Sequence, residues 1–98
     1  MLTSKQRANL RSKANKMETI LQVGKDGITE NLIVQVDDAL TARELIKMRV
    51  LENSPLSARE ACFDLAEATK SEGVQIIGTR FVLFRRNKDK AQYDDCLK

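Results

Sequence analysis

Residues 19–40 decide the fold, and they read TILQVGKDGITENLIVQVDDAL. The run Thr19–Val23 is short, rich in β-branched residues and followed by glycine, which predicts a strand. A helix is predicted from Thr29 to Leu40, because Thr29 can act as its N-cap and apolar residues recur at helical spacing. A four-residue segment, Gly24-Lys25-Asp26-Gly27, joins the two elements. We therefore expect a strand–loop–helix unit, and we call its connection the glycine loop.

The glycine loop has the features of a phosphate-binding turn. Two glycines let the backbone pass close to a ligand, and the following helix N-terminus adds unpaired N–H groups and a partial charge of about +0.5. Lys25 can contact a phosphate. Asp26 has three open interpretations: it caps the helix, it hydrogen-bonds a sugar or base edge, or it serves the turn. By itself the pattern is weak evidence, because most glycine pairs at this spacing are plain turns.

The rest of the chain predicts further alternating elements. Thr3 and Gln6 form a possible capping box for a helix over residues 4–16. Downstream we expect a strand over Glu44–Leu51, a helix from Ser57 to about Glu72 ended by Gly73, and strands Val74–Ile77 and Arg80–Arg86 joined by a turn. The order α-β-α-β-α-β-β predicts an α/β fold: a single small domain with a four-stranded mixed sheet packed by helices, its β-α-β units favouring parallel pairs.

Length and cysteine use bound the organisation of the chain. At 98 residues we expect one domain, over residues 2–87, followed by a loose polar tail over residues 88–98. Cys62 falls on the apolar stripe of a predicted helix and Cys96 in the tail, so we expect no disulfide framework and a cytoplasmic location. No run approaches about 18 apolar residues, so no membrane partner is expected.

The distribution of charge indicates a polyanion partner. The formal net charge is only +3, but residues 1–17 contain five basic residues and no acid. They are Lys5, Arg7, Arg11, Lys13 and Lys16. Residues 80–88 hold Arg80, Arg85 and Arg86 and also lack acids, whereas residues 57–72 lean acidic. Such a polarised surface is typical of nucleic-acid binders, although charges scattered for solubility remain an alternative.

The available side chains favour binding over catalysis. The chain has no histidine, and its cysteines lack ligand partners nearby, so we expect neither a metal nor a cofactor. No combination of nucleophile, base and acid is present, so we do not expect an enzyme. The few aromatic residues argue against a broad base-stacking platform, which favours readout of RNA backbone or shape over sequence reading.

Several spaced blocks resemble a known family. They are residues 2–7 (LTSKQR), 23–30 (VGKDGITE), 42–50 (ARELIKMRV) and 75–86 (QIIGTRFVLFRR). Together they resemble the CRM domain, the chloroplast RNA splicing and ribosome maturation domain, in its stand-alone bacterial YhbY-like form. The resemblance covers roughly residues 2–87. An acid at Asp26 departs from the basic or neutral loops expected of the family.

The resemblance implies both fold and function. It implies a fold similar to the C-terminal domain of bacterial translation initiation factor three, with a glycine loop compared to the backbone-clamping loop of KH domains. Stand-alone bacterial members are associated with precursors of the large ribosomal subunit. We therefore expect a monomeric RNA-binding protein that binds ribosomal RNA in 50S precursors, and no DNA.

The expected RNA contacts combine the loop, the first helix and the sheet. The candidate residues are Gly24, Lys25, Asp26, Gly27, Lys5, Arg7, Arg11, Lys13, Lys16, Lys47, Arg49, Arg80, Arg85 and Arg86. Lys47 and Arg49 enter this set because they alternate with apolar residues along a predicted strand. The alternative is a protein-interaction module that docks its acidic third helix on a ribosomal protein or assembly factor.

Overall fold

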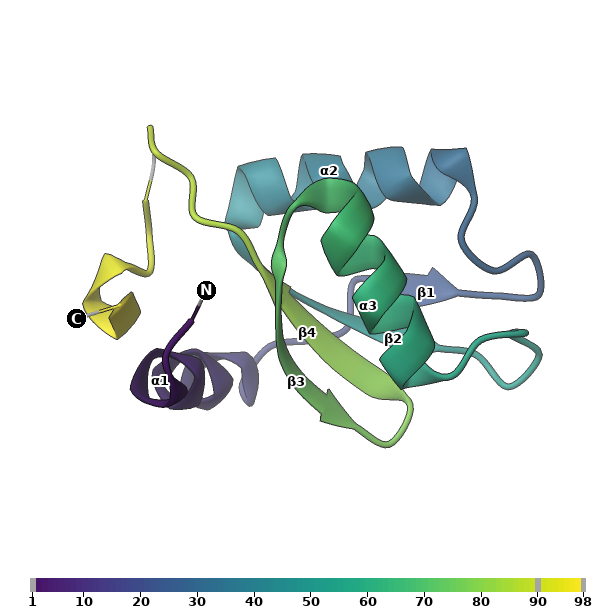
Figure 1. Ribbon diagram of the computed structural model, residues 1–98, viewed down its shortest axis with the longest axis horizontal. Coiled ribbons are helices and arrows are strands. Elements are labelled where there is room, and N and C mark those ends of the chain that lie inside the picture. The colour runs from purple at the N-terminus through teal and green to yellow at the C-terminus, as the bar shows by residue number, and fades with distance from the viewer. Residues whose placement is uncertain (1, 90, 98) are drawn as a thin grey trace.

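The computed structural model describes residues 2–89 and 91–97. Its elements are α1 (Ser4–Ala14), β1 (Leu21–Val23), α2 (Glu30–Arg43), β2 (Leu45–Val50), α3 (Ala58–Thr69), β3 (Glu72–Ile77), β4 (Arg80–Phe84) and a short 3₁₀ helix, η1 (Asp94–Leu97). The predicted order of helices and strands is confirmed (Figure 1). Among the described residues, no helix combines the length and apolar content needed to cross a bilayer.

The strands form a mixed sheet in the order β1-β2-β4-β3. β1 pairs with β2 in parallel, while β4 is antiparallel to both β2 and β3. The predicted hairpin is confirmed, and Gly78 supplies the positive φ of +58° that its turn requires. β2 and β3 do not pair directly, because β4 lies between them. Hence β1 and β3 are the two edges of the sheet.

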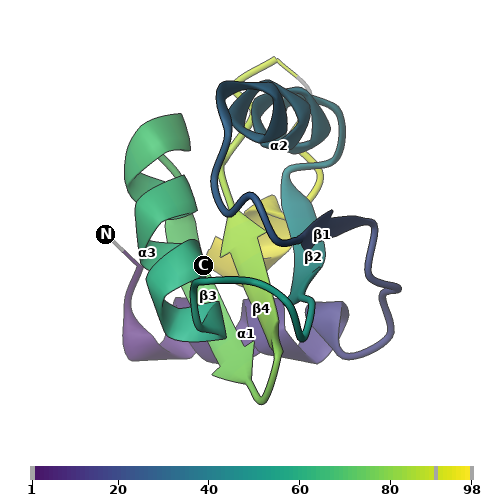
Figure 2. The same cartoon turned by 90° about the vertical axis from the view of Figure 1, so that its right-hand side faces the viewer.

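Helices cover both faces of the sheet (Figure 2). On the α2 and α3 face, the buried residues include Val36, Leu65, Met48 and Phe81. On the α1 face, a smaller cluster holds Leu10, Ala14, Leu45, Val74, Val82, Phe84 and Cys96. Because side chains alternate along a strand, β2 and β4 each contribute to both clusters. On the α1 face, α1 therefore covers the first residue of β2, Leu45.

Two capping boxes fix the starts of α1 and α3. The Gln6 N–H donates to Thr3 Oγ1 at 3.1 Å, and the Thr3 N–H donates to Gln6 Oε1 at 2.8 Å. Ser57 and Glu60 repeat this arrangement: the Glu60 N–H donates to Ser57 Oγ at 3.2 Å, and the Ser57 N–H donates to Glu60 Oε1 at 3.0 Å. The hydrogen bonds from Ser57 hold the pKa of the Glu60 carboxyl below its ordinary value. Contacts over three residues are readable from sequence, and this explains why both starts were predicted correctly.

All three predicted helix ends differ from the structure, and α2 ends at Arg43 instead of Leu40. α1 ends at Ala14 instead of residue 16, and α3 ends at Thr69 instead of Glu72. Lys70 adopts a left-handed conformation with φ of 56°, and Glu72 already belongs to β3. Gly73 therefore does not end the helix. It lies within β3, where a Cβ atom would stand 3.0 Å from Cys62 Sγ.

The C-terminal residues pack on the domain, in contrast to the expected loose tail. Cys96 is buried in the α1-face cluster, and its carbonyl accepts a hydrogen bond from Asn9 Nδ2 at 3.2 Å. Tyr93 meets Phe84 edge-on, with 6.5 Å between ring centroids. Residues 90 and 98 of the predicted tail lie outside the described part. These contacts link distant residues, so periodicity within the tail could not show them.

Candidate nucleic-acid interface

The glycine loop is a tight turn between β1 and α2. The Gly27 N–H donates to the Gly24 carbonyl at 3.0 Å, which closes the turn. Gly27 has φ of +67°, in the region that favours glycine, and a Cβ there would lie 3.4 Å from Pro55 Cγ. Gly24 does not have a positive φ, and a Cβ atom added there would lie 3.8 Å from its nearest neighbour, Leu51 Cδ1. Only the second glycine is required by backbone conformation.

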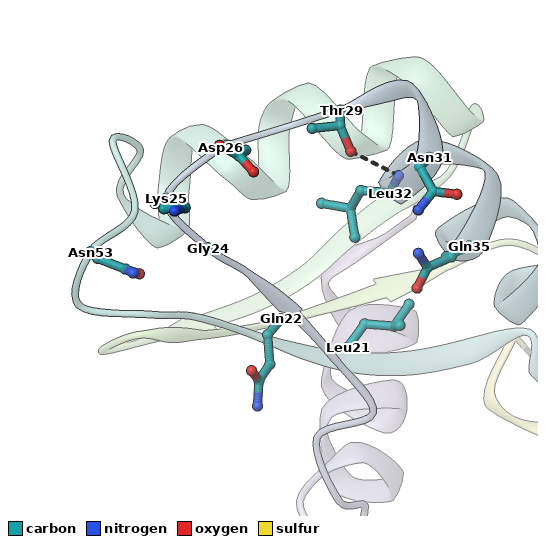
Figure 3. Close-up of a pocket in the computed structure, with 11 residues that line it drawn as sticks. Leu21, Gln22, Gly24, Lys25, Asp26, Thr29, Asn31, Leu32, Gln35 and Asn53 are labelled. Atoms are coloured by element: carbon teal, nitrogen blue, oxygen red, sulfur yellow. Dashed lines mark hydrogen bonds between the residues drawn. The ribbon is translucent and has the colours of Figure 1, made fainter.

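An open hollow of about 530 Å³ surrounds the loop (Figure 3). Its walls come from β1, the glycine loop, the first turns of α2 and the loop after β2. The lining residues are Leu21, Gln22, Gly24, Lys25, Asp26, Gly27, Thr29, Asn31, Leu32, Gln35 and Asn53. The edge position of β1 leaves this side of the sheet uncovered by another strand. The structure thus brings the four predicted loop residues to one concave surface.

The cap of α2 narrows the interpretation of Asp26. Thr29 is the N-cap, and its Oγ1 accepts a hydrogen bond from the Leu32 N–H at 3.1 Å. Asp26 therefore does not cap the helix. Its exposed side chain lies at the hollow, next to Lys25. Of the three interpretations, contact with a ligand and a turn role remain.

Four amide side chains also line the hollow, and sequence analysis missed them. They are Gln22, Asn31, Gln35 and Asn53. Two of them had a signal in the sequence, because Asn31 and Gln35 are four residues apart and share a helix face beside the loop. Asn53 had none, since only the tertiary fold brings the loop after β2 to this place. The hollow is consequently more polar and less basic than predicted.

The basic residues of α1, and Lys16 just after it, are mostly exposed. Exposed side chains belong to Lys5, Arg11, Lys13 and Lys16. Arg7 is half-buried, and its guanidinium donates to the Gly73 carbonyl, which ties α1 to the edge strand β3. The helix thus presents a basic exterior, as predicted, with Arg7 also holding the fold together.

Arg49 and Arg80 lie directly opposite each other on β2 and β4, and Gln22 on β1 is opposite Arg49. The Val50 N–H donates to the Thr79 carbonyl at 2.7 Å. The neighbouring pair, Arg49 and Arg80, is therefore of the non-hydrogen-bonded type, in which side chains are closest. We call Gln22, Arg49 and Arg80 the arginine row.

The arginine row lacks a counter-charge in the part of the chain that the structure describes. No carboxylate there pairs with Arg49 or Arg80, and Arg49 Nε is buried without a hydrogen-bond partner. Like charges that face each other across a sheet destabilise it. An anion bound between the two guanidinium groups would offset the repulsion between them. Gln22 is a lining residue of the hollow, but its side chain points to the opposite side of β1 from Leu21 (Figure 3), so the row meets the hollow only at the edge strand β1.

Lys47 has protein partners. Its Nζ donates to the carbonyl oxygens of Ala14 and Met17 at 3.3 and 3.4 Å. These carbonyls belong to the C-terminal end of α1, where a cation is favourable. The structure therefore gives Lys47 a role in fixing α1 to the sheet.

Arg85 and Arg86 also have partners within the protein. Arg85 pairs with Asp37 Oδ1 at 2.5 Å and donates to the Thr69 carbonyl at 2.8 Å. Arg86 Nε lies 2.9 Å from Asp94 Oδ1. These contacts join the end of β4 to α2, α3 and η1. The two arginines follow the strand that carries Arg80, but they lie beyond its opposite end.

The chain is similar to proteins named for RNA binding. "Probable RNA-binding protein YqeI" of Bacillus subtilis is 43% identical over 94 residues, covering 96% of this chain and 98% of the relative. "Probable RNA-binding protein MJ0652" of Methanocaldococcus jannaschii is 36% identical, covering 94% and 69%. The solution structure of SAV1595 from Staphylococcus aureus matches with a TM-score of 0.77 and 50% identity, covering 90% of this chain and 92% of that chain.

The family prediction is tested by a family model as well as by individual relatives. The model of the CRS1 / YhbY (CRM) domain matches residues 2–85, which includes α1, the glycine loop and all four described strands. The matched solved structure has the same small α/β architecture. The chain therefore belongs to the CRS1 / YhbY (CRM) domain family.

Proposed function

We propose that this protein binds RNA, and that its target is ribosomal RNA in precursors of the large ribosomal subunit during assembly. The observation that carries the proposal is the glycine loop at its open hollow, with the arginine row nearby across the edge strand β1. The loop places the cation of Lys25 at the hollow, and the row adds two guanidinium groups that have no counter-charge among the described residues. Phosphate oxygens are the ligands that such groups bind.

On this surface each group has a distinct role. Lys25 and the backbone of Gly24 and Gly27 contact one part of the RNA chain, and Arg49 and Arg80 hold a phosphate further along. The exposed cations of α1 provide the field that attracts RNA. We place Lys47, Arg85 and Arg86 outside the contact, because protein groups already occupy them.

The names of relatives support RNA binding, and the family resemblance suggests the ribosomal target. The relatives from Bacillus subtilis and Methanocaldococcus jannaschii are both named probable RNA-binding proteins. The resemblance to the stand-alone bacterial form of this family implies an association with precursors of the large subunit. In this proposal the protein is a cytoplasmic monomer that binds RNA and does not catalyse a reaction.

The test is RNA binding across a salt series, using fragments of large-subunit ribosomal RNA. Gly24→Asp is the informative variant because it adds a negative charge without backbone strain. The φ of Gly24 is not positive, and an added Cβ would lie 3.8 Å from the nearest atom. Gly27→Asp would add backbone strain. Ala68→Asp adds the same charge on the exposed side of α3, outside the hollow, and serves as the control.

We expect Gly24→Asp to weaken binding at least about tenfold, and Ala68→Asp to have little effect, with affinity of all forms falling as salt rises. Equal RNA binding by the two variants would show that the glycine loop is only a turn, and would assign RNA binding to α1. Absence of the protein from large-subunit precursor fractions on a sucrose gradient, with RNA binding intact, would remove the assembly role alone.

A second candidate function is docking to a protein through α3. Phe63 is 68% exposed on this helix, and the adjacent Asp64 and the nearby Glu67 are exposed as well. An exposed aromatic side chain with an acidic surround suits a basic protein partner. Capture of a ribosomal protein that survives Gly24→Asp and is lost on Phe63→Ala would support this function.

A further inference from the structure

We propose that the hollow beside the glycine loop recognises one unpaired RNA base, with a preference for guanine over uracil. The specificity-determining residues are Asp26, Asn31 and Gln35. The inference rests on the proposed RNA binding and extends it from backbone contact to base reading. It also departs from the readout of backbone or shape that the scarcity of aromatic residues favoured.

The charge of the hollow does not suit a site for phosphate alone. Among its described lining residues, Lys25 is balanced by Asp26, and the remaining side chains are uncharged. Phosphate contacts in nucleic-acid sites come largely from lysine and arginine. Arg49 and Arg80 belong to the arginine row and do not line the hollow. Some other property of the ligand must be recognised here.

The uncharged groups of the hollow match the edge of a base. Each amide of Asn31 and Gln35 carries two N–H donors and a carbonyl acceptor, the pattern that reads a base edge. The two residues project side by side from α2 toward the hollow (Figure 3). Neither amide has a hydrogen-bond partner among the described residues. Both are therefore available to a ligand without breaking a contact in the protein.

Leucine side chains supply a surface for the face of the base. Leu21 of β1 and Leu32 of α2 line the hollow between the loop and the two amides. Leu32 is only 8% exposed, so the surface is held in place by the core below it. A base can lie on this apolar patch without an aromatic partner. The few aromatics of the chain therefore do not exclude base recognition at a single position.

Asp26 gives the hollow its expected preference. Its carboxylate repels phosphate but accepts hydrogen bonds from two adjacent N–H donors. The Watson–Crick edge of guanine presents two such donors side by side, on the ring and on the amino group. Uracil presents a single N–H between two carbonyl oxygens, which the carboxylate repels. Because Thr29 caps α2, Asp26 is not needed for the helix.

The experiment compares two short unstructured RNAs, an all-uridine strand and the same strand with one guanine. Wild type is measured beside Asp26→Asn, the double variant Asn31→Ala with Gln35→Ala, and Glu30→Gln. Glu30 is an exposed acid in the first turn of α2 that does not line the hollow, so its variant controls for lost charge. Thermal unfolding checks that every variant is folded.

We expect wild type and Glu30→Gln to bind the guanine strand at least about tenfold more tightly, as one good hydrogen-bonded pair provides. Asp26→Asn should bind all-uridine RNA more tightly and lose the guanine preference. The double amide variant should lose the preference with an unchanged salt slope.

Two results would overturn the inference while leaving the proposed function in place. In one, wild type binds both strands equally. In the other, Asp26→Asn strengthens binding to both strands equally, which is the behaviour of an acid that only repels phosphate. Failure of wild type to bind any RNA, including ribosomal fragments, would instead remove the proposed function and this inference together.

Discussion

β4 has an arginine at its start and two more just past its end, and the two ends of the strand differ in what surrounds them. Arg80 faces Arg49 across the sheet, and no described carboxylate pairs with either. Arg85 is bonded to Asp37 and to the carbonyl of Thr69. We call the first region the open end and the second the latched end (Figure 1).

The difference between the two ends shows that a basic residue in a strand has no role until its neighbours are known. At the latched end, charge is used to connect α2, α3 and η1. At the open end, two like charges are held together at a cost to the fold. Groups that destabilise a folded protein are often found where it binds a ligand. The predictions below change one end at a time.

The largest expected effect on stability is at the latched end, for Glu44→Ala. Glu44 is 1% exposed, and its carboxylate accepts hydrogen bonds from the backbone N–H groups of Asn87, at 2.8 Å, and Gln92. The change removes the charged acceptor of two part-buried hydrogen bonds and should lower the free energy of unfolding by about 2–4 kcal/mol. Urea unfolding measures it. An effect below that of an exposed alanine variant would contradict the latch.

Arg85→Ala and Arg80→Ala are a matched pair that should separate the two ends. Arg85→Ala loses a partly exposed ion pair and a bond to the end of α3, so we expect about 1–2 kcal/mol of lost stability. Arg80→Ala should leave stability nearly unchanged and reduce the magnitude of the RNA salt slope by about 0.7. Denaturant titration measures the stability of both variants, and RNA binding across a salt series measures their salt slopes. Equal changes in both quantities for the two variants would show that the two ends of β4 do not differ.

Arg49→Met should move stability and binding in opposite directions. The change removes a buried Nε without a partner and the repulsion with Arg80, while the methionine keeps much of the side-chain packing. We expect the free energy of unfolding to rise by up to about 1 kcal/mol and RNA binding to weaken. A less stable variant with normal RNA affinity would show that Arg49 serves the fold.

The smallest effect belongs to the capping box of α3, which lies at neither end. The pKa of Glu60 is lowered by Ser57, so the stability that it contributes is present above the unfolded value of 4.5 and is lost as pH falls through the folded pKa. Ser57→Ala removes the hydroxyl but keeps the backbone N–H, which is the larger cause of the shift, so the pKa of Glu60 followed by NMR should rise only part of the way toward 4.5. An unchanged pKa would assign the whole shift to the backbone N–H.

The sequence predicted the features that depend on residues close together in the chain. Both capping boxes involve contacts over three residues, and the glycine loop with its helix is a local unit. The failures occur where distant residues meet. Gly73 was interpreted as a helix stop, whereas its lack of a side chain makes room for Cys62. Asn53 reaches the hollow only because the loop after β2 folds beside the glycine loop.

By itself, the sequence determined the order of the elements, the helix starts, the glycine loop and the resemblance to the CRM family. Local hydrogen bonding and side-chain periodicity depend on residues a few positions apart, so these features can be predicted without knowing the fold. Only the tertiary structure decided that β4 lies between β2 and β3, that η1 packs on α1, and which arginines face each other. The physical reason is that these arrangements are set by contacts between residues far apart in the chain, where packing and charge act through space.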